Sequence, residues 1–221
     1  MSIANYSDLK TAQQNWMARA DATFTNRQDD FIDMAEARFY WGFGEPGDSL
    51  HTPPLRVIGM ETTGDLTVSS QSVAQPTGFL EAIRLYLNTD PIVDLEFFPP
   101  DRFWNTTTVA DGSTGQPKIY TMEGSNFVFG PSPDSSYTGK LLYYKKLDAL
   151  DDTTTTNWLI TNAPYAYLYA IMLEAMIWDK NYEEAAKYAD LTRSAIVGLN
   201  RQRTMKQYSG ASLRGRPDKV A

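Results

Sequence analysis

The sequence predicts an α+β protein in which terminal helices form a helical bundle and the middle of the chain supplies an antiparallel, β-rich insert. Apolar residues recur at helical spacing before residue 41 and after residue 157, whereas short runs of alternating polarity fill most of the stretch between them. Because each pattern keeps to its own part of the chain, helices and strands are expected to segregate. The predicted organisation is one discontinuous helical domain (1–55 and 149–208), a β-rich insert (56–148) and a flexible basic C-terminal arm (209–221).

Two helices are expected at the N-terminal end. Ser7 is a suitable N-cap for the first, and Leu9, Ala12 and Trp16 then share one face. After a turn-like stretch at 20–26, a second helix is expected from Arg27 to Trp41, with acidic residues near its positive end. Its predicted inner face consists of Phe31, Met34, Ala35, Arg38 and Phe39. Residues 41–55 are rich in glycine and proline, which end the helix, and they suggest no role.

The middle of the chain carries the strand signals. Ile83, Leu85 and Leu87 alternate with polar neighbours, which is typical of a half-buried strand. A short helical piece is expected at Pro100–Trp104, and turns are expected at Thr63–Asp65, Glu123–Ser125 and Pro131–Asp134. The predicted strand runs are 56–62, 65–69, 82–88, 93–98, 117–122, 125–130 and 139–147.

Helical spacing returns at Asn157 and continues to the C-terminal region. Asn162 is the expected cap of a helix with Pro164 in its first turn, and the run Tyr165–Trp178 is apolar on nearly all sides, as a central buried helix would be. Asn181 is expected to cap the last helix, with Glu184 at the capping-box position. That helix is predicted to reach about Tyr208 and to project, basic and polar, past the core.

Composition excludes several kinds of chemistry. The 221 residues include no cysteine and one histidine, so disulfides, a cysteine nucleophile, thiolate zinc sites and multi-histidine metal clusters are ruled out. The N-terminus lacks the pattern of a signal peptide, and no apolar run approaches the ~18 residues of a membrane span, so no membrane association is expected.

The net charge of −7 divides unevenly along the chain. Residues 201–221 hold six basic residues and one acidic residue, or +5, whereas the other 200 residues hold 14 basic and 26 acidic residues, or −12. An acidic body disfavours general nucleic-acid binding. The basic end is either a solubilising terminus or an arm that orders on a partner with an acidic groove.

Candidate catalytic groups have simpler structural explanations. His51 lies in a proline-bounded loop, the pair Ser7 and Lys10 lacks the other motifs of an acylase, and Trp41–Gly44 lacks the later glycine of a phosphate loop. The acid pairs Asp29/Asp30 and Asp151/Asp152 leave a small hydrolase as one alternative. We expect no enzymatic activity, no cofactor and no metal.

A second alternative is a carbohydrate- or protein-binding module in the aromatic-rich β unit. Strand aromatics are more often core or interface residues than a sugar platform. The candidate platform residues are Trp104, Tyr120, Tyr137, Tyr143 and Tyr144.

The stretch 137–178 resembles the head-to-tail adaptor (connector) proteins of tailed bacteriophages and gene-transfer-agent particles. In that family a strand ending in Tyr-Tyr precedes a T-N-W-L segment and a helix of the P-x-x-Y-L-Y type. The matching positions here are Leu142–Lys145, Thr156–Leu159, Pro164, Tyr167–Tyr169 and Glu174–Ala175. Further pieces resemble the family in the same order, at 29–38, 76–81, 115–124, 127–134 and 198–201.

The resemblance implies a structural protein of the virion neck, made in the host bacterial cytoplasm. Twelve copies would form a ring on the portal protein, encircle double-stranded DNA without reading its sequence, and offer a platform to a nozzle, stopper or tail tube. The C-terminal helix and arm of such adaptors dock on the portal. Mapped onto this chain, the portal-binding residues would be Arg201, Arg203, Lys206, Tyr208, Arg214, Arg216 and Lys219.

Overall fold

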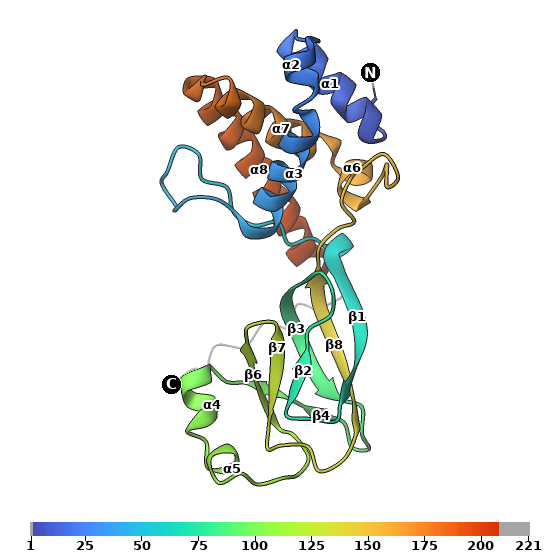
Figure 1. Cartoon of the computed structure of the whole chain (residues 1–221), viewed down its shortest axis with the longest axis vertical. Coiled ribbons are helices and arrows are strands. Elements are labelled where there is room, and N and C mark those ends of the chain that lie inside the picture. The colour runs from blue at the N-terminus through green and yellow to red at the C-terminus, as the bar shows by residue number, and fades with distance from the viewer. Residues whose placement is uncertain (1, 208–221) are drawn as a thin grey trace, which may run out of the picture. The chain divides into compact units, whose positions relative to one another are not determined.

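The computed structural model describes residues 2–207, and it has the α+β class that the sequence predicts (Figure 1). Helices lie at both ends of the chain and strands in the middle. The chain divides into two compact units. We call Met1–Gly59 with Leu147–Ala221 the helical unit, and Met60–Lys146 the β unit.

The helical unit begins with α1 (Tyr6–Met17) and α2 (Ala22–Thr25). The cap of α1 is Asn5, whose side chain accepts a hydrogen bond from the Asp8 amide, so the prediction that Ser7 is the cap is wrong. Leu9 and Ala12 are buried as expected, but Trp16 is 52% exposed. The expected turn at 20–26 contains α2, which the side chain of Asp21 caps.

Helix α3 (Gln28–Trp41) packs one face into the core of the helical unit. Phe31, Ala35 and Phe39 are buried, as the spacing predicts. Met34 was expected on that face but is 48% exposed. The buried residues of α3 lie on the face that contains Ile32 and the residues three and four positions from it. Met34 lies outside this face.

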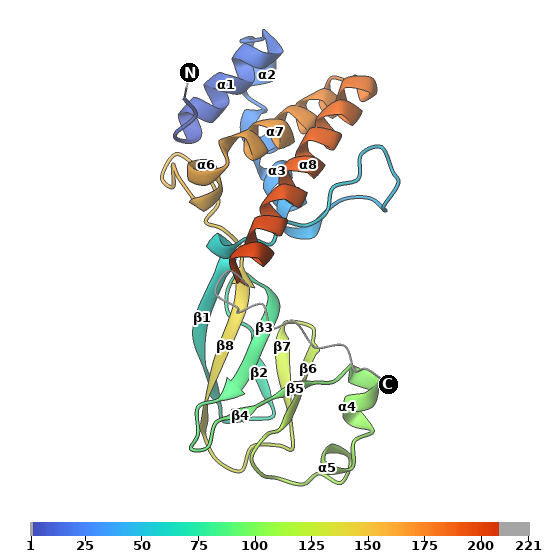
Figure 2. The same ribbon diagram turned by 180° about the vertical axis from the view of Figure 1, so that it is seen from behind.

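The remaining helices are α6 (Trp158–Asn162), α7 (Pro164–Trp178) and α8 (Tyr182–Gln207). Asn157 caps α6 by accepting hydrogen bonds from the Leu159 and Ile160 amides. The prediction that Asn162 caps the next helix is wrong, because Asn162 ends α6 and the chain turns at Ala163 before α7 begins at Pro164. Helix α7 is the central buried helix, in contact with α1, α3, α6 and α8 (Figure 2).

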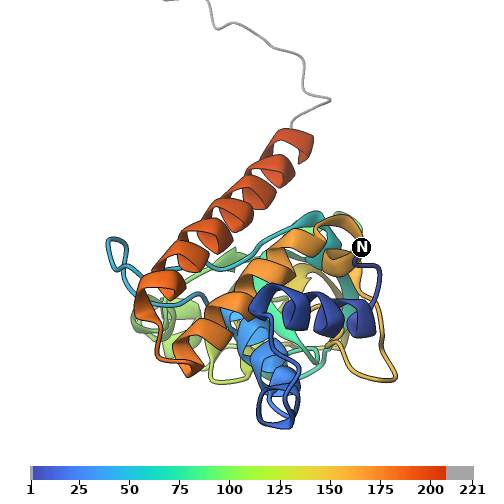
Figure 3. The ribbon, with the colours of Figure 1, turned by 90° about the horizontal axis from the view of Figure 1, so that it is seen from above.

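Helix α8 is the longest element of the chain. Asn181 caps its first turn by accepting a hydrogen bond from the Glu184 amide, as predicted. Ala185, Ala189, Ile196 and Leu199 are buried along its inner face. Its C-terminal turns extend beyond α7 (Figure 3). The predicted end near Tyr208 and the predicted arm at 209–221 lie outside the described residues.

The β unit contains two four-stranded sheets. The first has the order β1 (Glu61–Val68), β8 (Tyr137–Lys145), β3 (Phe79–Leu87) and β4 (Val93–Asp94), all antiparallel. The second has the order β2 (Ser72–Ala74), β7 (Asn126–Gly130), β6 (Ile119–Glu123) and β5 (Glu96–Phe97). Side chains of both sheets, including Leu85, Leu87, Phe127, Phe129 and Leu141, form one apolar core.

Several predictions for the β unit need correction. The expected turn at Thr63–Asp65 lies inside the continuous strand β1, which is fully paired with β8. Most of the expected strand at 56–62 is instead a loop and the 3₁₀ turn η1 (Ile58–Met60). Strand β5 pairs parallel to β6, although an antiparallel insert was expected. A short run of strand-like sequence does not reveal whether its strand pairs parallel or antiparallel, because the direction depends on the connection between the two strands.

Other features of the β unit follow the sequence closely. Helix α4 (Pro100–Trp104) is where the proline-led pattern predicts it, and a short helix α5 (Thr107–Ala110) follows without a sequence prediction. In β3, Leu85 and Leu87 are buried as the alternation predicts, whereas Ile83 is half-buried. The pairing of β3 with β8 shifts register between Ala82 and Arg84, which displaces Ile83 from the regular alternation.

Candidate functional site

The predicted portal-binding residues begin in the last turns of α8. Arg201, Arg203 and Lys206 belong to the described helix, while the other four predicted residues lie outside the described part of the chain. Arg201 is exposed and forms no ion pair with any residue between 2 and 207. Met205 is 65% exposed one turn further on. The end of α8 therefore offers a positive charge and an apolar side chain to solvent.

Asn200 fixes this end of α8 to the segment that leaves α3. The Asn200 side-chain amide donates to the Pro54 carbonyl at 2.9 Å, and its oxygen accepts from the Arg56 backbone amide at 2.7 Å. The two bonds join residues that are more than 140 positions apart in the sequence. They hold the base of the basic segment in place, so that its charges begin from a defined position.

A small cavity of about 160 Å³ lies beside this anchor. Arg203, Leu199 and Trp158 contribute to its lining. Gly59 packs against the Trp158 ring, where an added Cβ would lie 2.2 Å from a ring carbon, so no larger residue fits there. Arg203 thus lies half-buried against the helical unit, whereas Arg201 faces solvent.

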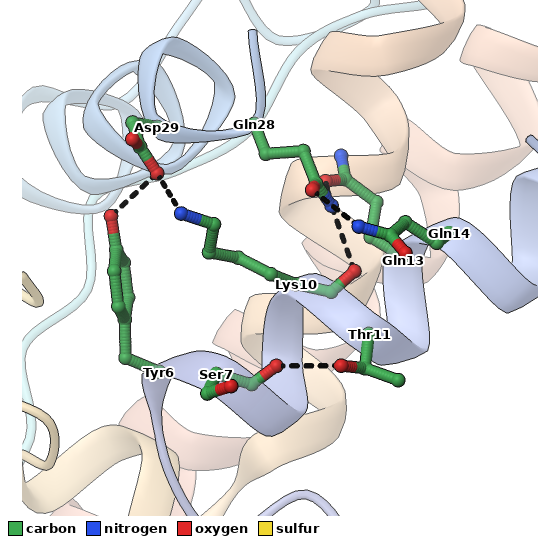
Figure 4. Close-up of polar contacts among 8 residues, drawn as sticks. All are labelled: Tyr6, Ser7, Lys10, Thr11, Gln13, Gln14, Gln28 and Asp29. Carbon is green, nitrogen blue, oxygen red and sulfur yellow. Dashed lines mark hydrogen bonds and ion pairs between the residues drawn. The ribbon is translucent and has the colours of Figure 1, made fainter. Parts of the chain in front are cut away.

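Of the acid pair Asp29/Asp30, Asp29 is engaged in contacts between α1 and α3 (Figure 4). Asp29 accepts hydrogen bonds from the Tyr6 hydroxyl at 2.7 Å and the Lys10 ammonium at 2.6 Å. These donors lower the pKa of Asp29, and burial beside this carboxylate raises the pKa of Tyr6. Asp30 pairs with Arg27 at 3.0 Å. Asp29 therefore stabilises the α1–α3 contact, and Asp30 forms a local pair at the start of α3.

The same contact removes the acylase interpretation of Ser7 and Lys10. Lys10 is ion-paired with Asp29 and so is not a free base for a serine nucleophile. Beside it, three glutamines join α1 to α3, and Figure 4 shows them pointing toward one another. The Gln28 amide donates to the Lys10 carbonyl and to Gln13, and Gln14 donates to Gln28.

The second acid pair shapes a turn. The Asp151 carboxylate accepts hydrogen bonds from the backbone amides of Thr153 and Thr154, and Asp152 is exposed beside it. Among residues 2–207, no three acidic or histidine side chains gather closely enough to hold a metal ion.

His51 closes a loop rather than serving as a base. Its Nδ1 lies 3.1 Å from the Phe43 carbonyl oxygen and 3.0 Å from that of Gly44, so Nδ1 carries the proton and donates to them. The sequence Trp41–Gly44 ends α3, with Gly42 at a φ of 71°, as the helix-end interpretation predicts.

The five candidate platform aromatics do not form one exposed surface. Tyr120, Tyr143 and Tyr144 are buried, at 6%, 6% and 3% exposure. Trp104 is 45% exposed, but its indole N–H donates to Glu123 at 2.5 Å. These rings mainly build the core of the β unit, so the structure gives the sugar-platform alternative no support.

Two features of the helical unit had no counterpart in the sequence analysis. The segment after α3 forms a hairpin-like loop, closed by a bridge between Phe43 and Thr52 and held by Arg38 and Arg193. Arg38 also forms a buried ion pair with Glu174 of α7, at 2.7 Å. The inward position of Arg38 in the helical pattern was the available signal, but a sequence does not show which acid lies opposite.

The side chains of Lys10, Asp29, Asp30, His51 and Asp151 are thus engaged in structural contacts, while Arg201 near the end of α8 faces solvent. The structure defines an α+β protein. The chain belongs to the SU10 adaptor protein family, whose pattern matches residues 4–216. This confirms the resemblance to phage head-to-tail adaptors, a class of structural phage proteins. No curated protein of similar sequence was found. Within the described residues no helix is both long and apolar enough to span a bilayer.

Proposed function

We propose that this protein forms a ring in the neck of a phage particle, docks on the portal protein and extends the DNA channel toward the tail. The observation that carries the proposal is the family match over residues 4–216. The exposed Arg201 near the end of α8 supports the position of the docking site. The ring would hold twelve copies. It would provide the platform on which a nozzle, a stopper or a tail tube assembles.

The docking residues would be Arg201, Arg203, Lys206, Tyr208, Arg214, Arg216 and Lys219. Asn200 holds the base of this segment, so its charges start from a fixed position on the helical unit. A basic segment binds most strongly to an acidic groove, because fixed opposite charges both steer association and retain the complex. A portal surface with clustered carboxylates is the expected partner.

The remaining 200 residues carry a charge of −12, and this supports the proposed place around DNA. Contacts between basic side chains and phosphates produce tight binding that is independent of sequence. An acidic wall would leave the DNA free to pass through the channel. The protein would act without enzymatic chemistry, after its synthesis in the bacterial cytoplasm and assembly into the virion neck.

Portal binding by variants of the full chain tests this function. Truncation after Gln207, combined with Arg201→Gln, removes the charges of Arg201, Arg214, Arg216 and Lys219, and it leaves Asn200, Arg203 and Lys206 in place. We expect affinity for the portal to fall at least about tenfold, as for the loss of several close charge pairs. Lys187→Gln, on the exposed surface of the first turns of α8, is the matched control. Portal binding that survives the truncation unchanged would refute the docking site.

A further inference from the structure

We propose that the loop 43–52 of one copy inserts into a cavity in the β unit of a second copy, and that this contact links neighbours in the ring. The inference rests on the proposed ring, and it names the two surfaces that would meet. One surface is an apolar cavity with two unmatched positive charges. The other is a stiff loop with an exposed phenylalanine and two unmatched negative charges.

The cavity lies in the β unit and has a volume of about 460 Å³. Phe98, Ile119 and Pro131 provide apolar walls, and Lys118 stands at its edge. Gly130 also lines the cavity, and an added Cβ there would lie 2.6 Å from a Val109 methyl carbon, so no larger residue fits at this position. The size is within the ~300–1,000 Å³ of pockets that accept compact ligands, and an aromatic side chain would fit.

Two cations beside this cavity lack acidic partners. The Arg102 guanidinium lies 3.8 Å from the centre of the Phe98 ring, which itself lines the cavity. Neither Arg102 nor Lys118 forms an ion pair with any of residues 2–207. By contrast, Arg84 and Lys140 of the same unit are paired with Asp94 and Asp65. The cavity therefore favours a partner in which an apolar side chain has carboxylate groups beside it.

The loop 43–52 offers this combination. Phe43 is 51% exposed, and the Arg38 guanidinium of the same unit lies 4.2 Å from the centre of its ring, so only the remaining part of the ring is available to a second copy. Glu45 and Asp48 form no ion pair within residues 2–207. The stretch 42–50 contains no basic residue. Among the described exposed apolar side chains, Phe43 stands out because it shares one projecting loop with two unpaired acids. Figure 1 shows the loop (light blue) standing away from the helices of its own unit.

The loop is held in shape although its tip is uncovered. Arg38 donates to the Leu50 carbonyl at 3.2 Å, and Arg193 donates to the carbonyls of His51 at 2.9 Å and Asp48 at 3.3 Å. The His51 Nδ1 group donates to the Phe43 carbonyl at 3.1 Å and so joins the two ends of the loop. Such bonds reduce the conformational entropy that would be lost on docking, which favours binding by a preorganised segment.

A contact between two different surfaces propagates from copy to copy. When the rotation between copies closes, the result is a ring, whereas a contact between identical surfaces stops at a dimer. Loop and cavity are different surfaces present on every copy. Their charges are opposite, with Glu45 and Asp48 facing Lys118 and Arg102, so the pairing would be directional.

Disulfide trapping tests the contact directly, because the native chain contains no cysteine. Two full-length single variants are prepared, one with Ser49→Cys at the loop and one with Gln116→Cys at the cavity. The two variants are then mixed together with portal protein. A bond between them links two different copies, since neither protein holds both cysteines. We expect at least tenfold more linked dimer than from Thr153→Cys mixed with Gln116→Cys, where Thr153 is an exposed residue of another loop.

Charge exchange supplies the second arm of the test. Lys118→Glu and Glu45→Lys should each raise the concentration needed for ring formation about tenfold, and the double variant should recover most of that loss. Rings of parental size that give no more cross-link than the control pair would overturn the loop contact and leave the proposed function intact. Failure of the parental chain to assemble with portal protein under any condition would overturn both.

Discussion

The helical unit and the β unit are stabilised in different ways. The helical unit buries polar and charged groups between its helices, including Gln13, Gln28, Glu36, Arg38 and Glu174. The main core of the β unit consists of aliphatic and aromatic side chains, and its charged pairs lie at the surface. Loss of one partner from a buried ion pair is costly, because the other charge is then left buried and unpaired. An apolar core contributes more to stability than to the choice of partner.

The buried ion pair of the helical unit should give the largest effect. Glu174→Ala leaves the Arg38 guanidinium, 6% exposed, without its carboxylate, and we expect a loss of about 3–5 kcal/mol in the free energy of unfolding. Urea unfolding followed by tryptophan fluorescence measures it, since four of the five tryptophans belong to this unit. The double variant Arg38→Met with Glu174→Leu should lose much less. A loss below about 1 kcal/mol for Glu174→Ala would contradict the comparison.

The β unit should respond to cavities instead. Leu141 is fully buried in its core, and Leu141→Ala should cost about 2–5 kcal/mol. Hydrogen exchange resolved by segment should show faster exchange in β1, β3 and β8, which surround this position. Leu191→Ala, on the exposed side of α8, serves as the control and should change stability by less than about 0.5 kcal/mol. Equal losses for the two substitutions would contradict the assignment of the core.

Glu36 should give the helical unit a characteristic pH dependence. Burial raises the pKa of the Glu36 carboxyl, although the Leu150 amide and the Tyr167 hydroxyl both donate to it at 3.0 Å. Its folded pKa lies above its unfolded value, so its contribution to stability is present below the ordinary glutamate pKa and is lost as pH rises through the folded pKa. The slope in that window reaches at most about 1.4 kcal/mol per pH unit.

Glu36→Gln isolates this contribution from the other titrating groups. The amide oxygen of glutamine can accept the same two hydrogen bonds, while the ionisation is removed. The difference in stability between parent and variant, measured from pH 4 to 8 by urea unfolding, should therefore shift in favour of the variant as pH rises. A difference that is constant over this range would show that Glu36 does not titrate abnormally.

Surface pairs of the β unit should matter least. Lys140 and Asp65 are 2.6 Å apart, but the Asp65 side chain is 63% exposed. Solvent screening and side-chain entropy reduce such a pair to about 0–1 kcal/mol. Asp65→Asn should accordingly produce a small loss, which disappears in 1 M salt. A loss comparable to that of Glu174→Ala would remove the distinction between the two units.

The sequence predicted the elements better than their contacts. The helix from Arg27, the central helix and the capped last helix follow from periodicity and from Asn181, because these signals are local. The cap at Asn5 instead of Ser7 differs by two residues, which is the usual error at a helix end. The parallel pairing of β5 with β6 was missed, since it depends on residues distant in sequence.

The same distinction applies to the candidate site. The basic end of α8 could be predicted because charge is visible residue by residue. The attachment of this helix end through Asn200 to Pro54 and Arg56 could not be predicted, because the sequence does not show which distant segment packs against the helix. The cavity beside Lys118 was also missed. Its walls come from three separate parts of the β unit, and no single stretch of sequence carries its pattern.

The discontinuous helical unit has a consequence for synthesis of the protein on the ribosome. Phe31 and Phe39 of α3 pack in a unit whose central helix α7 begins only at Pro164. The ribosome adds about 5–20 residues per second, so the roughly 120 residues between α3 and α7 take about 6–25 s. During that interval the apolar face of α3 lacks its partner helix. The intervening β unit is contiguous in sequence, and its order of synthesis allows it to fold before the bundle that flanks it is complete.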